Sequence, residues 1–284
     1  MDINLENVVF TYMKGTPFEK KALDNINILF PKGSITGIVG NTGSGKSTIL
    51  QLIAGLLIPD NGKVTIGEMC WSSMKDNYDL RKMIGIAFQN PENQLFEDTI
   101  EKDISYGPNN FGISEKQTLD YIKDIMKRIN LPYEKYAKMS PFELSEGQKR
   151  KVAIAGILAY KPKILLLDEP FAGMDLVGKN EILRMIKDLH ALKDAITIIV
   201  SHNMDEIASI VDNIIVLNNG KVVIEGEPEK IFADINLLEE NNLDIPEITR
   251  LIKKINEKIY PQIPLNCFSI EKLEEYIIER IQGD

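Results

Sequence analysis

A glycine-rich segment near the start of the chain carries the residue types that hold a phosphate chain. It lies between an apolar stretch and a helical pattern and reads Gly40-Asn41-Thr42-Gly43-Ser44-Gly45-Lys46-Ser47, followed by Thr48. Glycines let backbone N–H groups turn toward phosphate oxygens, and the positive end of the next helix faces the same anion. The spacing fits the phosphate-loop pattern, in which Lys46 reaches the β- and γ-phosphates and the Ser47 hydroxyl binds Mg²⁺. A glycine-rich turn that binds nothing is the alternative. The intact context disfavours it and predicts a nucleoside triphosphate site.

Two carboxylates end a second apolar segment, where Ile164 to Leu167 precede Asp168 and Glu169. Ligands gather at the carboxyl ends of parallel strands. Asp168 would hold Mg²⁺, directly or through water, and Glu169 could polarise an attacking water. Alone, the pair would indicate an ordinary solvated strand end. Together with the phosphate loop, it predicts a nucleotide-hydrolysing site.

Strand-length apolar segments alternate with helical patterns along most of the chain. The predicted strands are residues 3–12, 26–30, 34–39, 62–66, 84–89, 164–168 and 196–201, with a hairpin of 214–217 and 222–224. The predicted helices are residues 114–130, begun by Ser114 with Gln117, 144–160 and 176–192. Continuous apolar strands between helices indicate an α/β fold with a largely parallel sheet covered on both faces.

The composition changes after about residue 233, where strand patterns end. Pro246 is well placed to begin a helix with apolar residues at helical spacing over 248–255, and Ser269 is predicted to cap a last helix. We therefore expect a main domain, residues 1–233, followed by a small helical extension, residues 234–284.

Bulk properties exclude several classes of protein. The 284 residues carry a formal net charge of −9, whereas a nucleic-acid-binding surface needs a basic stripe. The first residues lack the pattern of a signal peptide, and the apolar runs are too short to span a bilayer. Cys70 and Cys267 match no metal-binding spacing and are interpreted as reduced thiols of a cytosolic protein.

A third motif, Leu144-Ser145-Glu146-Gly147-Gln148, precedes Asp168 by about twenty residues. With Lys46 and Asp168-Glu169, it makes the chain resemble the ATP-binding-cassette (ABC) ATPases, whose signature reads Leu-Ser-Gly-Gly-Gln. The resemblance covers about residues 2–233. It implies the P-loop NTPase fold of this family, with an N-terminal antiparallel β subdomain and a helical signature subdomain over about residues 90–160.

The resemblance also implies roles for four residues that follow the order of the family. Gln89 matches the glutamine that binds Mg²⁺ and the attacking water, and His202 matches the histidine that contacts the γ-phosphate. Asp175, in Ala172-Gly173-Met174-Asp175, matches the D-loop, and Tyr12 matches the aromatic that stacks on adenine. Taken alone, each of these residues also fits a purely structural role; Tyr12, for example, fits an aromatic residue of the hairpin.

In this family two cassettes face head to tail, and ATP lies between the phosphate loop of one and the signature of the other. The resemblance thus implies that Ser145, Gly147 and Gln148 contact nucleotide on a second subunit. Glu146 departs from the family because glycine is usual there. Its side chain either points away from the nucleotide, which we favour, or weakens the composite site by repulsion.

Three segments, residues 15–23, 88–99 and 150–156, look like the ATPases of energy-coupling factor (ECF) importers, which are related to the cobalt-importer ATPase. They are most similar to the second, A-prime type. This likeness implies an ATPase at the cytoplasmic face of the cell membrane that drives uptake of a vitamin or a transition-metal ion. Its implied partners are a second ATPase subunit, with a heterodimer favoured over a homodimer, a transmembrane coupling subunit and a separate membrane substrate-binding subunit. The extension would help to hold the ATPase pair together.

The coupling subunit is expected to dock near residues 89–100, where Leu95 and Phe96 lie among acidic residues. Alternatively, these two side chains belong to the core. Two other functions remain open: a soluble ABC ATPase not coupled to transport, and a nucleotide-gated scaffold. The excess of acidic residues and the single cassette disfavour a soluble ATPase. The presence of Glu169, Gln89 and His202 disfavours a scaffold. A P-loop kinase would leave the signature unexplained.

Overall fold

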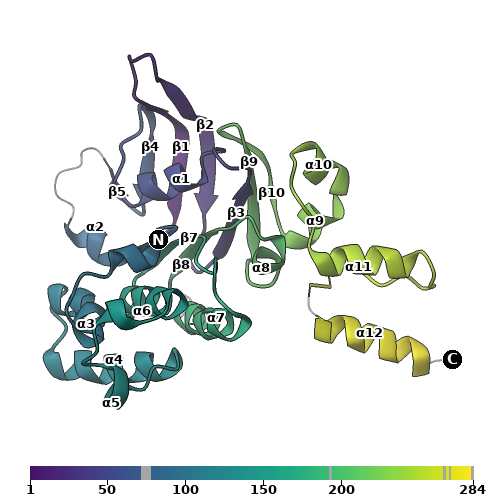
Figure 1. Ribbon diagram of the computed structural model, residues 1–284. Helices are drawn as coiled ribbons and strands as arrows, with labels where there is room; N and C mark the ends of the chain where they lie inside the picture. The colour runs from purple at the N-terminus through teal and green to yellow at the C-terminus, as the bar shows by residue number, and fades with distance from the viewer. Residues whose placement is uncertain (72–77, 192–193, 265–266, 269, 283–284) are drawn as a thin grey trace.

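The computed structural model describes residues 1–71, 78–191, 194–264, 267–268 and 270–282. Two sheets form its centre (Figure 1). The four-stranded antiparallel sheet has the order β2-β1-β4-β5, with β1 Ile3–Tyr12, β2 Lys20–Phe30, β4 Asn61–Ile66 and β5 Met69–Cys70. The six-stranded sheet has the order β10-β9-β3-β8-β7-β6, with β3 Ile35–Gly40, β6 Ile84–Ala87, β7 Ile164–Asp168, β8 Ile196–Val200, β9 Asn213–Asn218 and β10 Lys221–Gly226.

The larger sheet is parallel except at one edge, where β9 and β10 form an antiparallel hairpin. Every residue of β3, β7 and β8 is buried, as expected for strands covered on both faces. The sequence therefore predicted the fold class correctly. Strand β2 begins six residues earlier than predicted, because Lys20 and Lys21 pair with β1 although their side chains are exposed.

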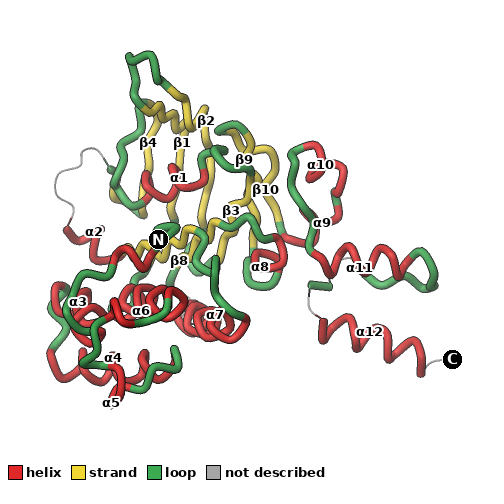
Figure 2. The backbone as a smooth tube through the Cα atoms, in the orientation of Figure 1, coloured by secondary structure: helices red, strands yellow, loops and turns green. Residues whose placement is uncertain are grey.

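Helices cover the larger sheet and continue into the C-terminal part (Figure 2). They are α1 Lys46–Ile53, α2 Tyr78–Met83, α3 Ile100–Asn110, α4 Glu115–Arg128, α5 Tyr133–Tyr136, α6 Glu146–Ala159, α7 Leu176–Ala191, α8 Met204–Ala208, α9 Pro228–Ala233, α10 Ile235–Glu240, α11 Glu247–Asn256 and α12 Ile270–Gln282. Two 3₁₀ turns span Pro91–Gln94 and Pro141–Glu143. No helix among the described residues is long and apolar enough to cross a membrane.

Two apolar cores hold these layers together. One contains side chains of α1, both sheets and Trp71, so α1 packs between the two sheets. The other joins the opposite face of the larger sheet to α3, α4, α6 and α7. The phosphate-loop helix is therefore fixed on both sides by buried apolar contacts.

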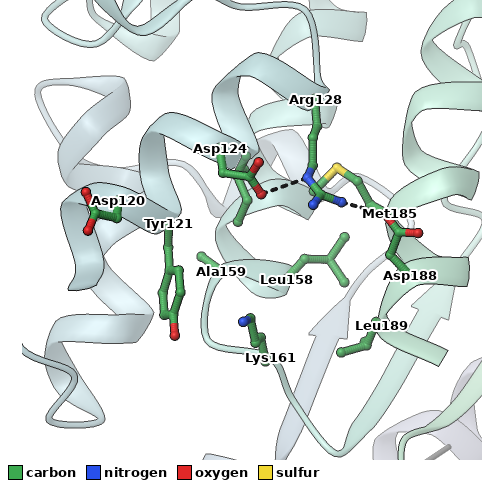
Figure 3. A pocket seen from close by; sticks show the side chains of 11 residues that line it. Asp120, Tyr121, Asp124, Arg128, Leu158, Ala159, Lys161, Met185, Asp188 and Leu189 are labelled. Carbon is green, nitrogen blue, oxygen red and sulfur yellow. Dashed lines mark hydrogen bonds and ion pairs between the residues drawn. The ribbon is translucent and has the colours of Figure 1, made fainter. Parts of the chain in front are cut away.

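The segment 90–160 contains α3 to α6 and meets the sheet domain along α7. A cavity of about 370 Å³ lies between α4, the end of α6 and α7 (Figure 3). Arg128 of α4 spans its rim, pairing with Asp124 at 2.7 Å and with Asp188 of α7 at 2.5 Å. Ser114 precedes α4. Its hydroxyl donates to the Gln117 side chain and accepts no hydrogen bond from a backbone amide, so it does not form the predicted side-chain-to-backbone cap.

The C-terminal segment packs in two parts. Leu238 and Leu243 belong to the core of the main domain, which also contains Phe232 of α9. A separate small cluster forms between α11 and α12 from Ile252, Ile263, Cys267 and Leu273. Cys70 and Cys267 form no disulfide. Ser269, predicted to cap the last helix, lies outside the described residues.

Candidate functional site

The phosphate loop connects β3 to α1 and needs glycine at its tightest points. Gly43 and Gly45 have φ angles of +82° and +105°, in the region that favours glycine. A Cβ on Gly40 would lie 2.2 Å from the carbonyl oxygen of Leu217, and one on Gly45 would lie 2.8 Å from that of Ala22. Neighbouring backbone therefore excludes larger residues from the loop, as in a phosphate cradle.

Lys46, the first residue of α1, folds back over this loop. Its ammonium group donates to the carbonyl oxygens of Gly40 at 2.7 Å and Asn41 at 3.0 Å. Burial lowers the pKa of Lys46, whereas the nearby negative charges of Glu169 and Asp168 raise it. The predicted loop and the predicted carboxylates therefore lie together in the fold.

Asp168 is buried at the end of β7, beside Val200 of β8. Burial raises the pKa of this carboxyl, whereas a hydrogen bond from Ser47 and the charge of Lys46 lower it. Ser47 and Asp168 thus present two oxygen ligands of the kind that Mg²⁺ prefers.

Glu169 lies one residue beyond the strand, in a left-handed backbone conformation with φ of +50°. Its carboxylate lies 2.8 Å from Nδ1 of His202 and accepts a 3.4 Å hydrogen bond from Ser201. Non-glycine residues in this conformation are uncommon and concentrate at functional sites. The backbone turn directs Glu169 toward His202, which follows β8.

A small cavity of about 150 Å³ lies beside the loop. It is lined by Tyr12, Lys20, Ala22, Gly43, Gly45, Lys46, Ser47 and Thr48. The Tyr12 hydroxyl lies 3.1 Å from the Thr48 hydroxyl and donates to Gln51 at 3.2 Å. Sequence reasoning missed Lys20, a second cation at this cavity. Its position next to a phosphate loop becomes visible only when β2 pairs with β1.

The signature residues lie at a different place, around the start of α6. Ser145 caps this helix, because its hydroxyl accepts from the Gln148 amide while the Gln148 side chain accepts from the Ser145 amide. An open pocket of about 440 Å³ is lined by Ser145, Gly147, Gln148 and Asp175, together with Lys151, Gly173, Met174 and Gly178. Asp175 caps α7 by accepting from the Gly178 amide at 2.7 Å. Ser145 and Glu146 are both exposed.

Gln89 follows β6 with an exposed side chain, and its backbone oxygen accepts from Arg150 at 3.1 Å. Arg150 of α6 is only 8% exposed and also pairs with Glu92 at 3.1 Å. A third bond runs from Arg150 to the carbonyl oxygen of Ala172. Arg150 therefore joins the helix of the signature to the Gln89 segment and the D-loop. Sequence reasoning quoted this residue without a role, because helical spacing does not reveal a buried arginine.

The loop fits a nucleoside triphosphate with Mg²⁺. The Ser44 hydroxyl is buried and has no hydrogen-bond partner among the described residues, so it is available to an incoming phosphate oxygen. The searched part of the chain contains no group of three or more His, Cys, Asp or Glu residues that could hold a metal alone. This donor set suits Mg²⁺ that is bound mainly by phosphates, water and one or two protein oxygens.

Comparisons with known proteins identify similar chains. The ABC transporter family model matches residues 23–172, which include the phosphate loop, the signature and Asp168-Glu169. The energy-coupling factor transporter ATP-binding protein EcfA2 of Clostridium tetani is 44% identical over 280 residues, 98% of this chain and 97% of that protein. The protein of the same name from Caldanaerobacter subterraneus subsp. tengcongensis is 46% identical over 284 residues, 100% of this chain and 99% of that protein.

Two solved structures of ABC transporter proteins are also similar to this chain. CbiO1 of Clostridium perfringens, described as part of the ABC transporter complex cbiONQ, is 33% identical with a TM-score of 0.71, covering 88% of this chain and 98% of that one. The ATP-binding cassette MJ0796, solved as a post-hydrolysis dimer with ADP and Pi, is 29% identical with a TM-score of 0.71, covering 80% and 98%.

The chain belongs to the ABC transporter family and has the ATPase fold of that family. Two relatives that match nearly its whole length are named as energy-coupling factor transporter ATP-binding proteins EcfA2. The resemblance inferred from the motifs is therefore confirmed.

Proposed function

We propose that this chain is an ATP-hydrolysing subunit of an ECF-type importer, working at the cytoplasmic face of the cell membrane. Its full-length relatives bear the name of ECF transporter ATP-binding proteins, and the similar CbiO1 is part of a transporter complex. The cargo is a vitamin or a transition-metal ion such as cobalt, which a separate membrane subunit binds.

The proposed chemistry assigns a task to each residue around the phosphate loop. Lys46 neutralises the β- and γ-phosphates, while Ser47, Asp168 and Gln89 hold Mg²⁺. Glu169 accepts the proton of the attacking water, and His202 orients Glu169 and the γ-phosphate. The observation that carries this proposal is the 2.8 Å contact between His202 and Glu169 beside Lys46 and Asp168. Tyr12 stacks on the adenine.

The ATPase works as a pair with a second ABC ATPase subunit, and a related but different chain is the favoured partner. The pocket at Ser145 and the cavity at Lys46 are separate on one chain, and each has exposed residues. A second chain that places its signature over this phosphate loop would complete the donors around the γ-phosphate. Hydrolysis then depends on closure of the pair, because closure excludes water and completes the electrostatic site.

The transmembrane coupling subunit docks near residues 89–100. Here Leu95 is buried, but Phe96 is 58% exposed and stacks edge-on against Tyr106. Both aromatic rings line a cavity of about 140 Å³ that also includes Asp103 and Tyr160. A short cytoplasmic helix with apolar and basic residues fits this combination of exposed aromatic rings and carboxylates.

Purification of the tagged full-length chain from its native membranes tests this function. We expect the wild-type chain to bring along a second ATPase and membrane subunits. Phe96→Asp should lose the membrane subunits and keep the second ATPase. Phe18→Asp is the matched control, because Phe18 is 78% exposed at the distant β1–β2 hairpin, and it should keep all subunits. A wild-type chain that binds no membrane subunit would contradict the transport function and favour a soluble ATPase or a scaffold.

A further inference from the structure

The C-terminal segment contacts the phosphate loop directly through one buried residue. Asn241 follows α10 and is 9% exposed. Its backbone oxygen accepts a 2.9 Å hydrogen bond from the Asn41 side chain. Its own side chain accepts from Asn218 of β9 at 2.8 Å and donates to the carbonyl oxygen of Leu237 at 2.8 Å. Every polar group of this side chain is thus used to fix the carbonyl that meets Asn41.

Asn41 is also one of the two residues whose carbonyl oxygens hold the Lys46 ammonium group. Its backbone oxygen accepts from Lys46 at 3.0 Å, while its side chain donates to Asn241. The β9–β10 turn supports the same loop, since the Gly220 amide donates to the Ser44 carbonyl at 3.1 Å. A continuous set of hydrogen bonds therefore runs from the end of α10 through Asn41 to Lys46.

A second contact joins the same segment to the other side of the site. The amide of Glu247, at the start of α11, donates to the Asp205 carboxylate at 2.8 Å. Asp205 lies in α8, three residues after His202. Residues 235–247 thus touch both segments that carry the proposed γ-phosphate contacts, Lys46 and His202.

We propose that Asn241 is a positioning residue for the phosphate loop, through which the C-terminal segment and ATP binding influence each other. This inference rests on the proposed nucleotide site and adds a function to the C-terminal segment beyond holding the ATPase pair together. Because coupling between two sites is reciprocal, ATP must also stabilise the α10–α11 segment.

ATP affinity of the purified full-length chain tests the inference, measured by titration of a fluorescent ATP analogue. We expect Asn241→Ala to weaken ATP binding about tenfold, because the variant loses the side-chain hydrogen bonds that position the loop. Asn256→Ala is the matched control. Asn256 is half-buried and bonds both to the amide and to the carbonyl of Ile263, so these side-chain bonds lie between α11 and α12 and not at the phosphate loop. It should change the affinity less than about twofold.

A double-mutant cycle separates positioning from general damage. If Asn241 acts through Asn41, the double variant Asn41→Ala/Asn241→Ala should bind ATP as weakly as Asn41→Ala alone. Fully additive losses would overturn the inference. In the wild-type chain, ATP should also slow amide hydrogen exchange over residues 235–241, and Asn41→Ala should remove this protection. That readout remains decisive if Asn241→Ala does not fold.

Two failures can be distinguished. If Lys46→Ala binds ATP normally, the proposed nucleotide site is wrong. If Lys46→Ala loses ATP binding while Asn241→Ala matches Asn256→Ala, the site stands and only the role of Asn241 is disproved.

Discussion

At the residue scale, the site holds opposite charges away from water. Burial moves the pKa values of Asp168 and Lys46 toward their neutral forms, and each charge partly offsets the cost of the other. We propose that this pair serves to bind Mg²⁺ and phosphate, because burying charge gives little net stability.

We predict that Asp168→Asn stabilises the isolated chain at neutral pH but lowers Mg²⁺-dependent ATP hydrolysis at least about a hundredfold. Because the pKa of Asp168 is raised in the folded state, its neutral form favours folding, and this stability is lost as the pH rises through the folded pKa. The higher melting temperature of the variant should therefore shrink as the pH falls toward 3.8, the usual pKa of this carboxyl. Melting curves against pH measure it, and an equal difference at all pH values would contradict this cause.

Substitution of the neighbouring carboxylate, Glu169, is expected to separate ATP binding from ATP hydrolysis. Glu169→Gln keeps the size of the side chain and its contact with His202 but cannot accept a proton. We expect ATP affinity to stay within about threefold, while hydrolysis falls by about a hundred- to ten-thousandfold. Phosphate release and nucleotide binding, measured on the same preparation, separate the two effects. Near-normal turnover would remove Glu169 from the role of base.

Glu146 tests whether the departure from the family signature matters. Its side chain is exposed in the first turn of α6, where a carboxylate favours the helix. We expect Glu146→Gly to change the ATPase rate less than about threefold, with the same salt dependence, because the charge lies in solvent. A clear rate increase that disappears at high salt would support a weakened composite site instead.

At the element scale, Arg150 sets the position of the signature helix relative to the catalytic strands. It is buried and bonds to Glu92, to the Gln89 carbonyl and to the Ala172 carbonyl. Arg150 therefore connects α6 to the Gln89 segment and to the D-loop. Arg128 also connects two elements, α4 and α7, but its ion pairs are exposed.

These two arginines provide a matched comparison of stability. We predict that Arg150→Ala lowers the free energy of unfolding by about 3 kcal/mol, because it leaves Glu92 half-buried without its partner. Arg128→Ala should cost less than about 1 kcal/mol, since solvent screens its pairs. Urea denaturation of both variants measures the difference. Equal losses would show that Arg150 does not hold these elements together.

The elements themselves were largely predictable because short continuous apolar runs such as 164–167, set between helical patterns, favour buried strands. The early start of β2 was not predictable, since Lys20 and Lys21 are polar and pair with β1 only through the backbone. The phosphate loop was predicted from its spacing, and the two carboxylates from their place after an apolar run together with that loop; their roles in the site stay predictions. Arg150, Lys20 and Asn241 were not, because each gains its role from chain segments distant in sequence.

At the scale of the whole molecule, the proposed function gives one chain two halves of different ATP sites. The cavity at Lys46 and the pocket at Ser145 lie apart, each with exposed residues that a second subunit can reach. In the proposed pair, this arrangement would link hydrolysis to the approach of two subunits, so that movement of the attached membrane partner would follow ATP binding.

A structure of the Glu169→Gln variant with Mg·ATP and its second ATPase subunit tests this account most directly. We predict that the triphosphate lies along Gly40 to Ser47, with Mg²⁺ on Ser47 and Asp168, and that the signature of the second subunit covers the γ-phosphate. Ser145 of this chain should face the nucleotide of the other subunit. A nucleotide bound away from Lys46, or a Ser145 that remains in solvent while both nucleotides are bound, would contradict it.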